Sequence, residues 1–315
     1  MSKLLIPFFL LFFSGTLTAQ NENQPTMNDW TYPYQVKHLA LNDSIDIAYI
    51  DEGSGDSTLL FVHGLGSNLQ AWKNNIDTLR LHYRCIAIDL PGYGKSSKES
   101  YPFSMQFFGK AILDFTKNMG LEKPTLIGHS MGGQASIHAA LAEPDLFSNL
   151  ILVAPAGFEQ FSEAEKIWFK NVYTPELIKM TPVEQIKKNF EINFYQMPDD
   201  ALFMIEDRLK MRETTEYDYY CAMIPQCVYG MLTEPVFDRL PELSTRTLVV
   251  YGANDALIPN KFMHPKLTTE GVANAGKNQI PEAQLVLLDE AGHFVQWEQA
   301  AAFNKLLTQF IQAKK

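Results

Sequence analysis

Short, continuous apolar runs are the feature of this sequence that most restricts its fold. They lie at Leu59–Val62, Cys85–Ile88, Thr125–Ile127 and Leu150–Val153. Runs without alternation predict strands that are buried on both faces. The stretches between the runs carry the spacing of amphipathic helices, near residues 69–81, 105–119 and 134–141. Buried strands that alternate with helices predict an α/β fold, with a doubly wound, mostly parallel sheet covered by helices on both faces.

The alternation is interrupted once, in the middle of the chain. Residues 158–242 contain no convincing buried strand and carry helical patterns instead. The strand pattern returns at Thr247–Tyr251 and Leu285–Leu288. The sequence therefore predicts one α/β core, made of residues 34–157 and 243–315, with a helical cap of residues 158–242 inserted before the last two strands.

Both ends of the predicted core carry simple periodic patterns. Residues 34–50 alternate between apolar and polar side chains, with Asn42–Asp43 as a turn. This pattern predicts an antiparallel hairpin. The apolar spacing over residues 298–312 predicts a final helix.

The first nineteen residues predict a signal peptide. Lys3 precedes the apolar run Leu4–Phe13, and small and polar residues follow it. This order is typical of an export signal, here cleaved after Ala19. A run of this length is too short to span about 30 Å of hydrocarbon. We therefore expect an exported protein, periplasmic or secreted, in which residues 20–33 form a flexible N-terminal segment.

The charge of the chain limits its partners. With 26 Lys and Arg against 36 Asp and Glu, the formal net charge is -10. Nucleic acids and anionic membranes are bound through basic faces, so neither is an expected partner. The three cysteines, Cys85, Cys221 and Cys227, match neither a zinc site nor a disulfide framework, although pairing of Cys221 with Cys227 stays open. We expect a small-molecule substrate, no metal, no cofactor and no stable membrane insertion.

The segment Gly128–Gly133 (GHSMGG) predicts a nucleophile. It follows a predicted strand and precedes a helix predicted to begin near Gln134. A tight turn between strand and helix projects the hydroxyl of Ser130 clear of the sheet, at a helix N-terminus. Such a turn needs residues without bulk at Gly128 and Gly132, because the backbone of the serine is strained. The competing interpretation is a glycine-rich helix entry without a catalytic role.

A serine needs a base to take its proton and an acid to orient that base. His293 follows the last predicted strand, and Asp255 follows the strand before it. Loops at the carboxyl ends of parallel strands are where such sheets place their sites. The order Ser130, Asp255, His293 suits this architecture, although a helix N-cap is the alternative role for Asp255.

Asp89 is the competing acid, in a segment that reads better as a structural turn, and His129 is expected to be structural and to point away from Ser130. The remaining histidines considered have no motif: His38, His82, His138 and His264.

Two backbone N–H groups are needed to bind the oxyanion. One belongs to the residue after the nucleophile, Met131. The other is expected in the loop His63–Gly66 (HGLG), at Leu65. Gly64 allows the backbone to approach the substrate, so it is a candidate binding residue. A simple glycine turn is the alternative interpretation.

These segments together resemble the α/β-hydrolase superfamily, over roughly residues 35–312. The resemblance rests on His63–Gly66, Asp89–Ser96 (DLPGYGKS), Gly128–Gly133 and Ala291–His293 (AGH). It implies the α/β-hydrolase fold, a Ser-His-Asp triad and no cofactor. Serine at the nucleophile position, where epoxide hydrolases and haloalkane dehalogenases carry Asp, departs from those two groups.

Two subfamilies share further motifs with this chain. Ser130–Ala135 (SMGGQA) resembles monoacylglycerol lipase-type esterases, and Gly292–Glu298 (GHFVQWE) resembles the meta-cleavage-product hydrolases, which split C–C bonds. The latter usually carry Asn immediately before the nucleophile, where this chain has His129. The resemblance therefore implies an esterase or lipase that cleaves esters with an apolar acyl group. The alternatives are C–C bond hydrolysis, peptidase action on small peptides, and a weakly catalytic ligand receptor on the same fold.

The predicted cap is rich in aromatic and methionine side chains. Most of them are expected to pack the cap on the core, and the rest to line an apolar pocket above Ser130. Arg208 and Arg212, one helical turn apart, are expected on a solvated face, with contact to a substrate carboxylate as the alternative. Trp297 is a core residue by its pattern and a minor candidate for substrate contact.

Overall fold

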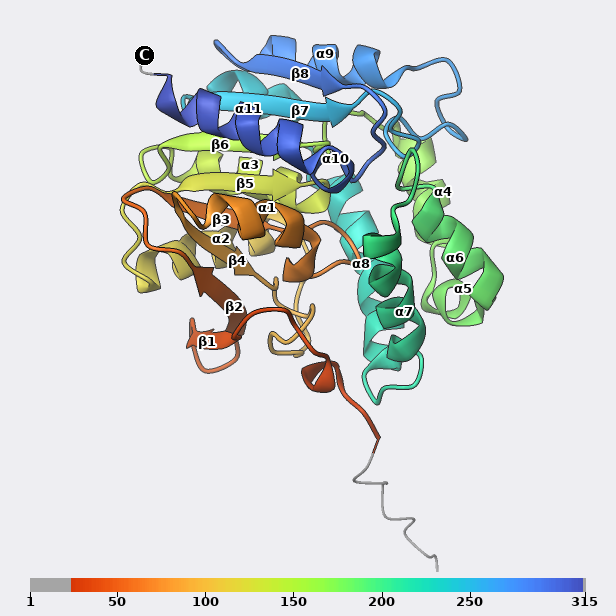
Figure 1. The fold of residues 1–315 in the computed structure, drawn as a ribbon. Helices are drawn as coiled ribbons and strands as arrows, with labels where there is room; N and C mark the ends of the chain where they lie inside the picture. Colours follow the sequence, from red (N-terminus) through yellow and green to blue (C-terminus); the bar gives the residue numbers. More distant parts are fainter. Residues whose placement is uncertain (1–23, 314–315) are drawn as a thin grey trace, which may run out of the picture.

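The described chain, residues 24–313 of the computed structural model, folds around one mixed sheet of eight strands (Figure 1). The strands are β1 (Lys37–Ala40), β2 (Asp46–Glu52), β3 (Thr58–Val62), β4 (Arg84–Ile88), β5 (Thr125–His129), β6 (Asn149–Val153), β7 (Thr247–Gly252) and β8 (Gln284–Leu288). Their order across the sheet is β1-β2-β4-β3-β5-β6-β7-β8. The β1–β2 and β2–β4 pairs are antiparallel, and every other pair is parallel. The predicted fold class is confirmed, including the N-terminal hairpin.

The sheet separates two hydrophobic cores, which explains the continuous apolar runs. Successive side chains of a strand point to opposite faces. Leu60 and Val62 of β3 therefore enter one core, and Leu59 and Phe61 enter the other. The first face is covered by α2 (Met105–Asn118), α3 (Met131–Ala142) and α9 (Thr269–Gln279), and the second by α1 (Lys73–Leu79), α10 (Val295–Glu298) and α11 (Ala300–Gln312).

Between β6 and β7 the regular elements are all helical, as predicted. They are α4 (Glu163–Val172), α5 (Pro175–Met180), α6 (Val183–Glu191), α7 (Leu202–Met211), α8 (Tyr217–Thr233) and the 3-10 helices η3 (Asp199–Ala201) and η4 (Phe237–Glu242). Side-chain caps start two of them, with Ser162 before α4 and Thr174 before α5. In Figure 1 these helices stand beside the ends toward which the parallel strands point. The cap therefore lies over the carboxyl ends of the parallel strands, next to the loops that carry Ser130, Asp255 and His293.

Some helices differ from the prediction. Ser130 lies in the tight turn between β5 and α3, which we call the elbow. Helix α3 begins at Met131 and not near Gln134, because Ser130 itself is its N-cap. The sequence pattern does not indicate helix α9, and it indicates α5 and α8 only as parts of the helical cap. In α8 the buried residues occupy one broad side, and the less buried side carries Ala222 and Tyr229 beside polar residues, so no clear polar stripe marks its period.

The N-terminal segment is packed, which corrects part of the prediction of a flexible tail over residues 20–33. Met27 and Tyr32 are buried. The N–H of Met27 donates to Glu216 Oε2 at 2.5 Å, and the hydroxyl of Tyr32 donates to Asp89 Oδ2 at 2.9 Å. Residues 24–33 thus touch both cap and core. The predicted signal peptide and residues 20–23 lie outside the described residues.

The three cysteines are free and buried, so Cys221 and Cys227 do not pair. The hydroxyl of Tyr93 instead contacts Cys227 Sγ at 3.1 Å. Among residues 24–313, none of the helices has the length and apolar character needed to cross a membrane.

Candidate active site

Ser130 lies on the turn between β5 and α3, in strained backbone. Its φ of 53° and ψ of -118° lie in a region that non-glycine residues rarely adopt. Its N–H donates to the carbonyl oxygen of Val153 at 2.9 Å, which holds the turn against β6. A Cβ at Gly128 would lie 2.5 Å from the oxygen of Gly132, and a Cβ at Gly132 would lie 2.3 Å from the oxygen of His63. Only glycine fits at both positions, which agrees with the turn expected from the sequence.

His293 and Asp255 form a buried hydrogen-bonded pair. His293 Nδ1 donates to Asp255 Oδ2 at 2.8 Å. The other oxygen of Asp255 accepts from the N–H groups of Leu257 at 2.8 Å and Ile258 at 3.0 Å. These bonds fix the carboxylate and assign the proton of the neutral ring to Nδ1, which leaves Nε2 as the acceptor. The structure therefore brings together two of the three predicted catalytic side chains by direct contact.

Ser130 and His293 meet at two cavities. One, of about 340 Å³, is walled mostly by apolar side chains of the cap such as Phe161, Phe169 and Leu232. The second, of about 450 Å³, extends from Ser130 under helices α5 to α8. Both cavities are lined by Ser130 and His293. The Ser130 hydroxyl has no side-chain hydrogen bond within the described chain, so it is available to His293 or to a ligand.

The predicted oxyanion donors lie beside Ser130. A Cβ on Gly64 would lie 3.1 Å from the Ser130 Cβ, so the loop approaches as closely as its glycine permits. The N–H groups of Leu65 and Met131 have no hydrogen-bond acceptor among residues 24–313. Leu65 and Gly64 also line the second cavity. Two unpaired N–H groups close to a hydroxyl are what an oxyanion site requires.

His63 anchors this loop, a role that sequence reasoning missed. Its Nδ1 donates to the oxygen of Gly64 at 2.8 Å, and its Nε2 accepts from the N–H of Leu90 at 3.0 Å. Burial lowers the pKa of His63 to about 4, so the ring is neutral at pH 7. The neutral ring suits one donor and one acceptor bond, and it ties the loop after β3 to the loop after β4.

His129 has a structural role, as expected, but its ring contacts the catalytic loop instead of lying apart from the site. Its Nε2 donates to the carbonyl oxygen of His293 at 2.9 Å, and its ring centroid lies 4.8 Å from that of His293. Burial holds the pKa of His129 well below its ordinary value. The ring is therefore a neutral support for the loop of His293. The two partners are 164 positions apart in the sequence, and no pattern in the sequence predicts this contact.

Asp89, the competing acid, is part of a turn. It is fully buried and accepts from the N–H groups of Leu69 at 2.7 Å and Lys95 at 2.8 Å, and from the hydroxyl of Tyr32. Burial raises its pKa to about 6. None of its bonds within the described chain goes to His293.

The prediction for the two arginines of the cap needs correction. Arg208 and Arg212 are half-buried and line the second cavity, not a solvated face, because α7 turns them toward the core. Trp297 lines neither cavity, and its burial agrees with the core position that its pattern predicts. Its indole is buried and donates from Nε1 to Asp200 Oδ1 at 2.9 Å, which ties α10 to the cap.

His264 also lacks a sequence motif but links two parts of the site. Its Nδ1 lies 2.6 Å from Glu159 Oε1, and its Nε2 lies 3.1 Å from Glu165 Oε1. Glu159 also accepts from the N–H of Asn260. These contacts join the start of the cap to the loop that follows Asp255. In the part of the chain that the structure describes, no cluster of three or more His, Cys, Asp or Glu side chains has the arrangement of a metal site.

A serine on a strained strand-turn-helix elbow, facing a His-Asp pair at the carboxyl edge of a mostly parallel sheet, defines a class of α/β enzymes. Residues 57–300 match the family model described as "alpha/beta hydrolase fold". The chain belongs to this family, and the resemblance stated from its motifs is confirmed. It is a hydrolase of the α/β-hydrolase fold.

The relatives point to different reactions. The chain is 30% identical over 278 residues to a 2-hydroxy-6-oxononadienedioate/2-hydroxy-6-oxononatrienedioate hydrolase of Escherichia coli K12, covering 85% of this chain and 91% of the relative. It is 28% identical over 267 residues to the dihydrolipoyllysine-residue acetyltransferase component of an acetoin cleaving system from Cupriavidus necator. That match covers 84% of this chain but only 66% of the relative's length.

Solved structures show the same fold. A probable hydrolytic enzyme from Pseudomonas aeruginosa PAO1 superposes with a TM-score of 0.79 at 23% identity, over 90% of this chain and 96% of that one. A thermophilic esterase from Thermogutta terrifontis superposes with a TM-score of 0.71 at 23% identity, over 88% and 98%. At these identities the likeness concerns the fold alone.

Proposed function

We propose that this protein is a serine esterase that cleaves carboxylic esters with an apolar acyl group through an acyl-enzyme. The observation that carries the proposal is the placement of Ser130, on a strained elbow and at cavities shared with the His293–Asp255 pair. Strain at a buried turn persists where function requires the side chain to be exposed. The apolar wall of the 340 Å³ cavity supports an apolar substrate group.

The mechanism follows from these positions. Ser130 Oγ attacks the ester carbonyl carbon while His293 Nε2 takes its proton, and Asp255 stabilises the resulting imidazolium. The N–H groups of Leu65 and Met131 donate to the oxyanion. The intermediate collapses to the acyl-enzyme, and His293 returns the proton to the departing alcohol. Water, deprotonated by His293, then attacks the acyl carbon. His293 returns this proton to Ser130 Oγ as the acyl bond breaks, which releases the acid and restores the serine hydroxyl.

Two cavities at one nucleophile favour esters with a sizeable group on each side of the bond. One cavity would hold the acyl group and the other the alcohol, since the ester carbon must lie at Ser130. The second candidate function is hydrolysis of a C–C bond beside a carbonyl. It is favoured by the 30% identity to the Escherichia coli hydrolase and by Arg208 and Arg212 at the second cavity.

The decisive experiment compares wild type with Ser130→Ala on p-nitrophenyl esters of increasing acyl length, a dipeptide amide and a dienone acid. Removing the nucleophile should lower ester turnover by about 10⁵-fold and leave the melting temperature nearly unchanged. Ser148→Ala, an exposed serine away from the elbow, is the matched control and should keep full activity. Ester hydrolysis that survives in folded Ser130→Ala would exclude Ser130 as the nucleophile. Turnover of the dienone acid alone would favour the second candidate.

We also propose export of the protein, on the strength of the Lys3 and Leu4–Phe13 pattern. Cell fractionation followed by N-terminal sequencing tests this proposal. A mature chain that starts at Gln20 outside the cytoplasm is the expected result. A chain with an intact N-terminus in the cytoplasm would contradict it.

A further inference from the structure

Arg208 of the cap is bonded to the loop that carries the predicted oxyanion donor Leu65. Arg208 Nη2 donates a hydrogen bond to the carbonyl oxygen of Gly66, the residue after Leu65. Gly66 has a φ of +64°, in the left-handed region that favours glycine. A Cβ at Gly66 would lie 2.6 Å from Arg208 Nη2. The guanidinium therefore lies directly against the backbone that fixes the direction of the Leu65 N–H.

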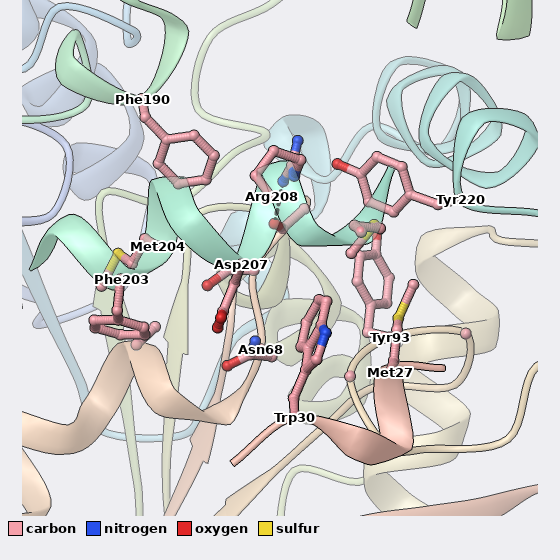
Figure 2. A pocket seen from close by; sticks show the side chains of 16 residues that line it. Met27, Trp30, Asn68, Tyr93, Phe190, Phe203, Met204, Asp207, Arg208 and Tyr220 are labelled. Atoms are coloured by element: carbon pink, nitrogen blue, oxygen red, sulfur yellow. Dashed lines mark hydrogen bonds between the residues drawn. The ribbon is translucent and has the colours of Figure 1, made fainter. Parts of the chain in front are cut away.

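Aromatic rings from two other cap helices hold this guanidinium in place. Figure 2 shows Arg208 between the rings of Phe190 in α6 and Tyr220 in α8. Its Cζ lies 5.1 Å from the Phe190 ring centroid and 4.6 Å from that of Tyr220. A planar guanidinium stacks on aromatic faces in a way that a lysine ammonium does not. The bond to Gly66 is therefore held in one direction by three helices of the cap.

The residue before Arg208 makes a second bond to the same segment. Asp207 Oδ2 accepts from Gln70 Nε2 at 3.3 Å. Gln70 belongs to the 3-10 helix η2 (Leu69–Trp72), which follows the loop directly. Two neighbouring residues of α7 thus contact the segment from Gly66 to Gln70 at both of its ends.

We infer that Arg208 is a positioning residue that sets the direction of the Leu65 N–H, so that the cap contributes to the oxyanion site. The inference rests on the proposed function, because it assigns Leu65 as an oxyanion donor. That N–H has no acceptor within the described chain, so its direction depends on the loop backbone, which His63 holds at the Gly64 carbonyl oxygen and Arg208 holds at the Gly66 carbonyl oxygen. An oxyanion donor is effective only at hydrogen-bond distance from the developing charge, and a shift of about 1 Å removes much of its effect.

Arg208 also lines the second cavity, so direct binding of a substrate anion is the competing role. The two roles affect different kinetic constants. A positioning residue acts on the transition state of every substrate, neutral or charged, and changes kcat. A residue that binds a substrate anion changes KM, and only for substrates that carry the anion.

The experiment compares Arg208→Met with wild type on p-nitrophenyl butyrate, which is neutral, and on mono-p-nitrophenyl glutarate, which is anionic. We expect kcat to fall by about 10- to 100-fold on both esters, with KM changed by less than about threefold. Lys210→Met is the matched control, because it removes a cation from the exposed face of the same helix. Arg208→Lys should recover part of the loss, since an ammonium can donate to Gly66 without stacking.

Amide hydrogen exchange over residues 63–72 provides a readout that does not depend on activity. Exchange in this segment should be faster in Arg208→Met and Arg208→Lys than in wild type and Lys210→Met. Unchanged exchange with unchanged kcat on the neutral ester overturns the inference, and so does a rise in KM confined to the anionic ester. Failure of a fluorophosphonate to label Ser130 in wild type would overturn the proposed function instead, and the exchange comparison would still decide whether Arg208 fixes the loop.

Discussion

At the scale of single residues, two buried aspartates at strand ends differ in what they contact. Asp255 accepts from the ring nitrogen of His293 and from two backbone N–H groups. Asp89 accepts from two backbone N–H groups and from the hydroxyl of Tyr32. One carboxylate can therefore stabilise a charge that forms during catalysis, whereas the other holds together three segments of the fold.

Replacement of each aspartate by asparagine should separate these roles. Asp255→Asn offers His293 an amide, which favours the wrong tautomer and removes the charge beside the imidazolium, so turnover should fall by about 10⁴-fold with KM little changed. Asp89→Asn places an amide N–H group against backbone donors, so it should lower the free energy of unfolding by about 1–3 kcal/mol and largely spare kcat. Ester kinetics and urea unfolding of both variants check this. An inactive Asp89→Asn beside a near wild-type Asp255→Asn would reverse the assignment.

Sequence pattern can place residues that end a strand, and it cannot place contacts between distant segments. The positions of Ser130, Asp255 and His293 follow from where each strand stops, because all parallel strands end at one edge. The bond from Arg208 to Gly66 spans 142 residues and depends on how the cap docks on the core. Docking is decided by side-chain packing, which leaves no period in the sequence.

At the scale of elements, the first turn of α3 packs so closely on the end of β3 that no side chain fits at position 132. A Cβ at Gly132 would lie 2.3 Å from the oxygen of His63 and 2.8 Å from that of Val62, and backbone atoms cannot rotate away. Gly132→Ala should therefore move α3 and the elbow, lowering stability by about 3 kcal/mol and kcat by about 100-fold. Thermal melting and ester kinetics measure both effects.

Gly271→Ala in α9 is the control for this element. Gly271 is exposed, and the nearest atom to a new Cβ is the Thr268 hydroxyl at 3.0 Å, in an exposed turn. Alanine is a better helix former than glycine, so the change in stability should stay within about 1 kcal/mol. Equal melting temperatures for Gly132→Ala and wild type would show that the close contact with β3 can accommodate a Cβ at position 132.

Elements with a clear period or a buried run were predicted well, and the others were not. The buried strands were found because both faces of the sheet are covered, so their runs are wholly apolar. The bounds of helix α8 are hard to place because it contains Pro225, which argues against a helix interior when only the sequence is read, and because its less buried side carries Ala222 and Tyr229 as well as polar residues.

At the scale of the whole molecule, the N-terminal segment joins the cap to the core. Met27 is 1% exposed, and its N–H bonds Glu216 at the start of α8. The oxygen of Pro25 accepts from Thr215 in the same loop, and Tyr32 bonds Asp89 in the core. The polar composition of this segment predicted flexibility, because its anchoring residues are few and their partners lie far along the chain.

A chain that begins at residue 34 should therefore be less stable than one that begins at residue 24. Removal of the segment exposes the surface around the Met27 side chain, worth about 1.5–3 kcal/mol, and removes hydrogen bonds of about 1 kcal/mol each. The melting temperature should fall by about 5 to 10 °C. Tyr32→Phe in the longer chain, which removes only the hydroxyl, should account for the smaller part of that fall. If both chain lengths melt at the same temperature, the segment rests on the surface without stabilising it, and the link between cap and core must come from the helices alone.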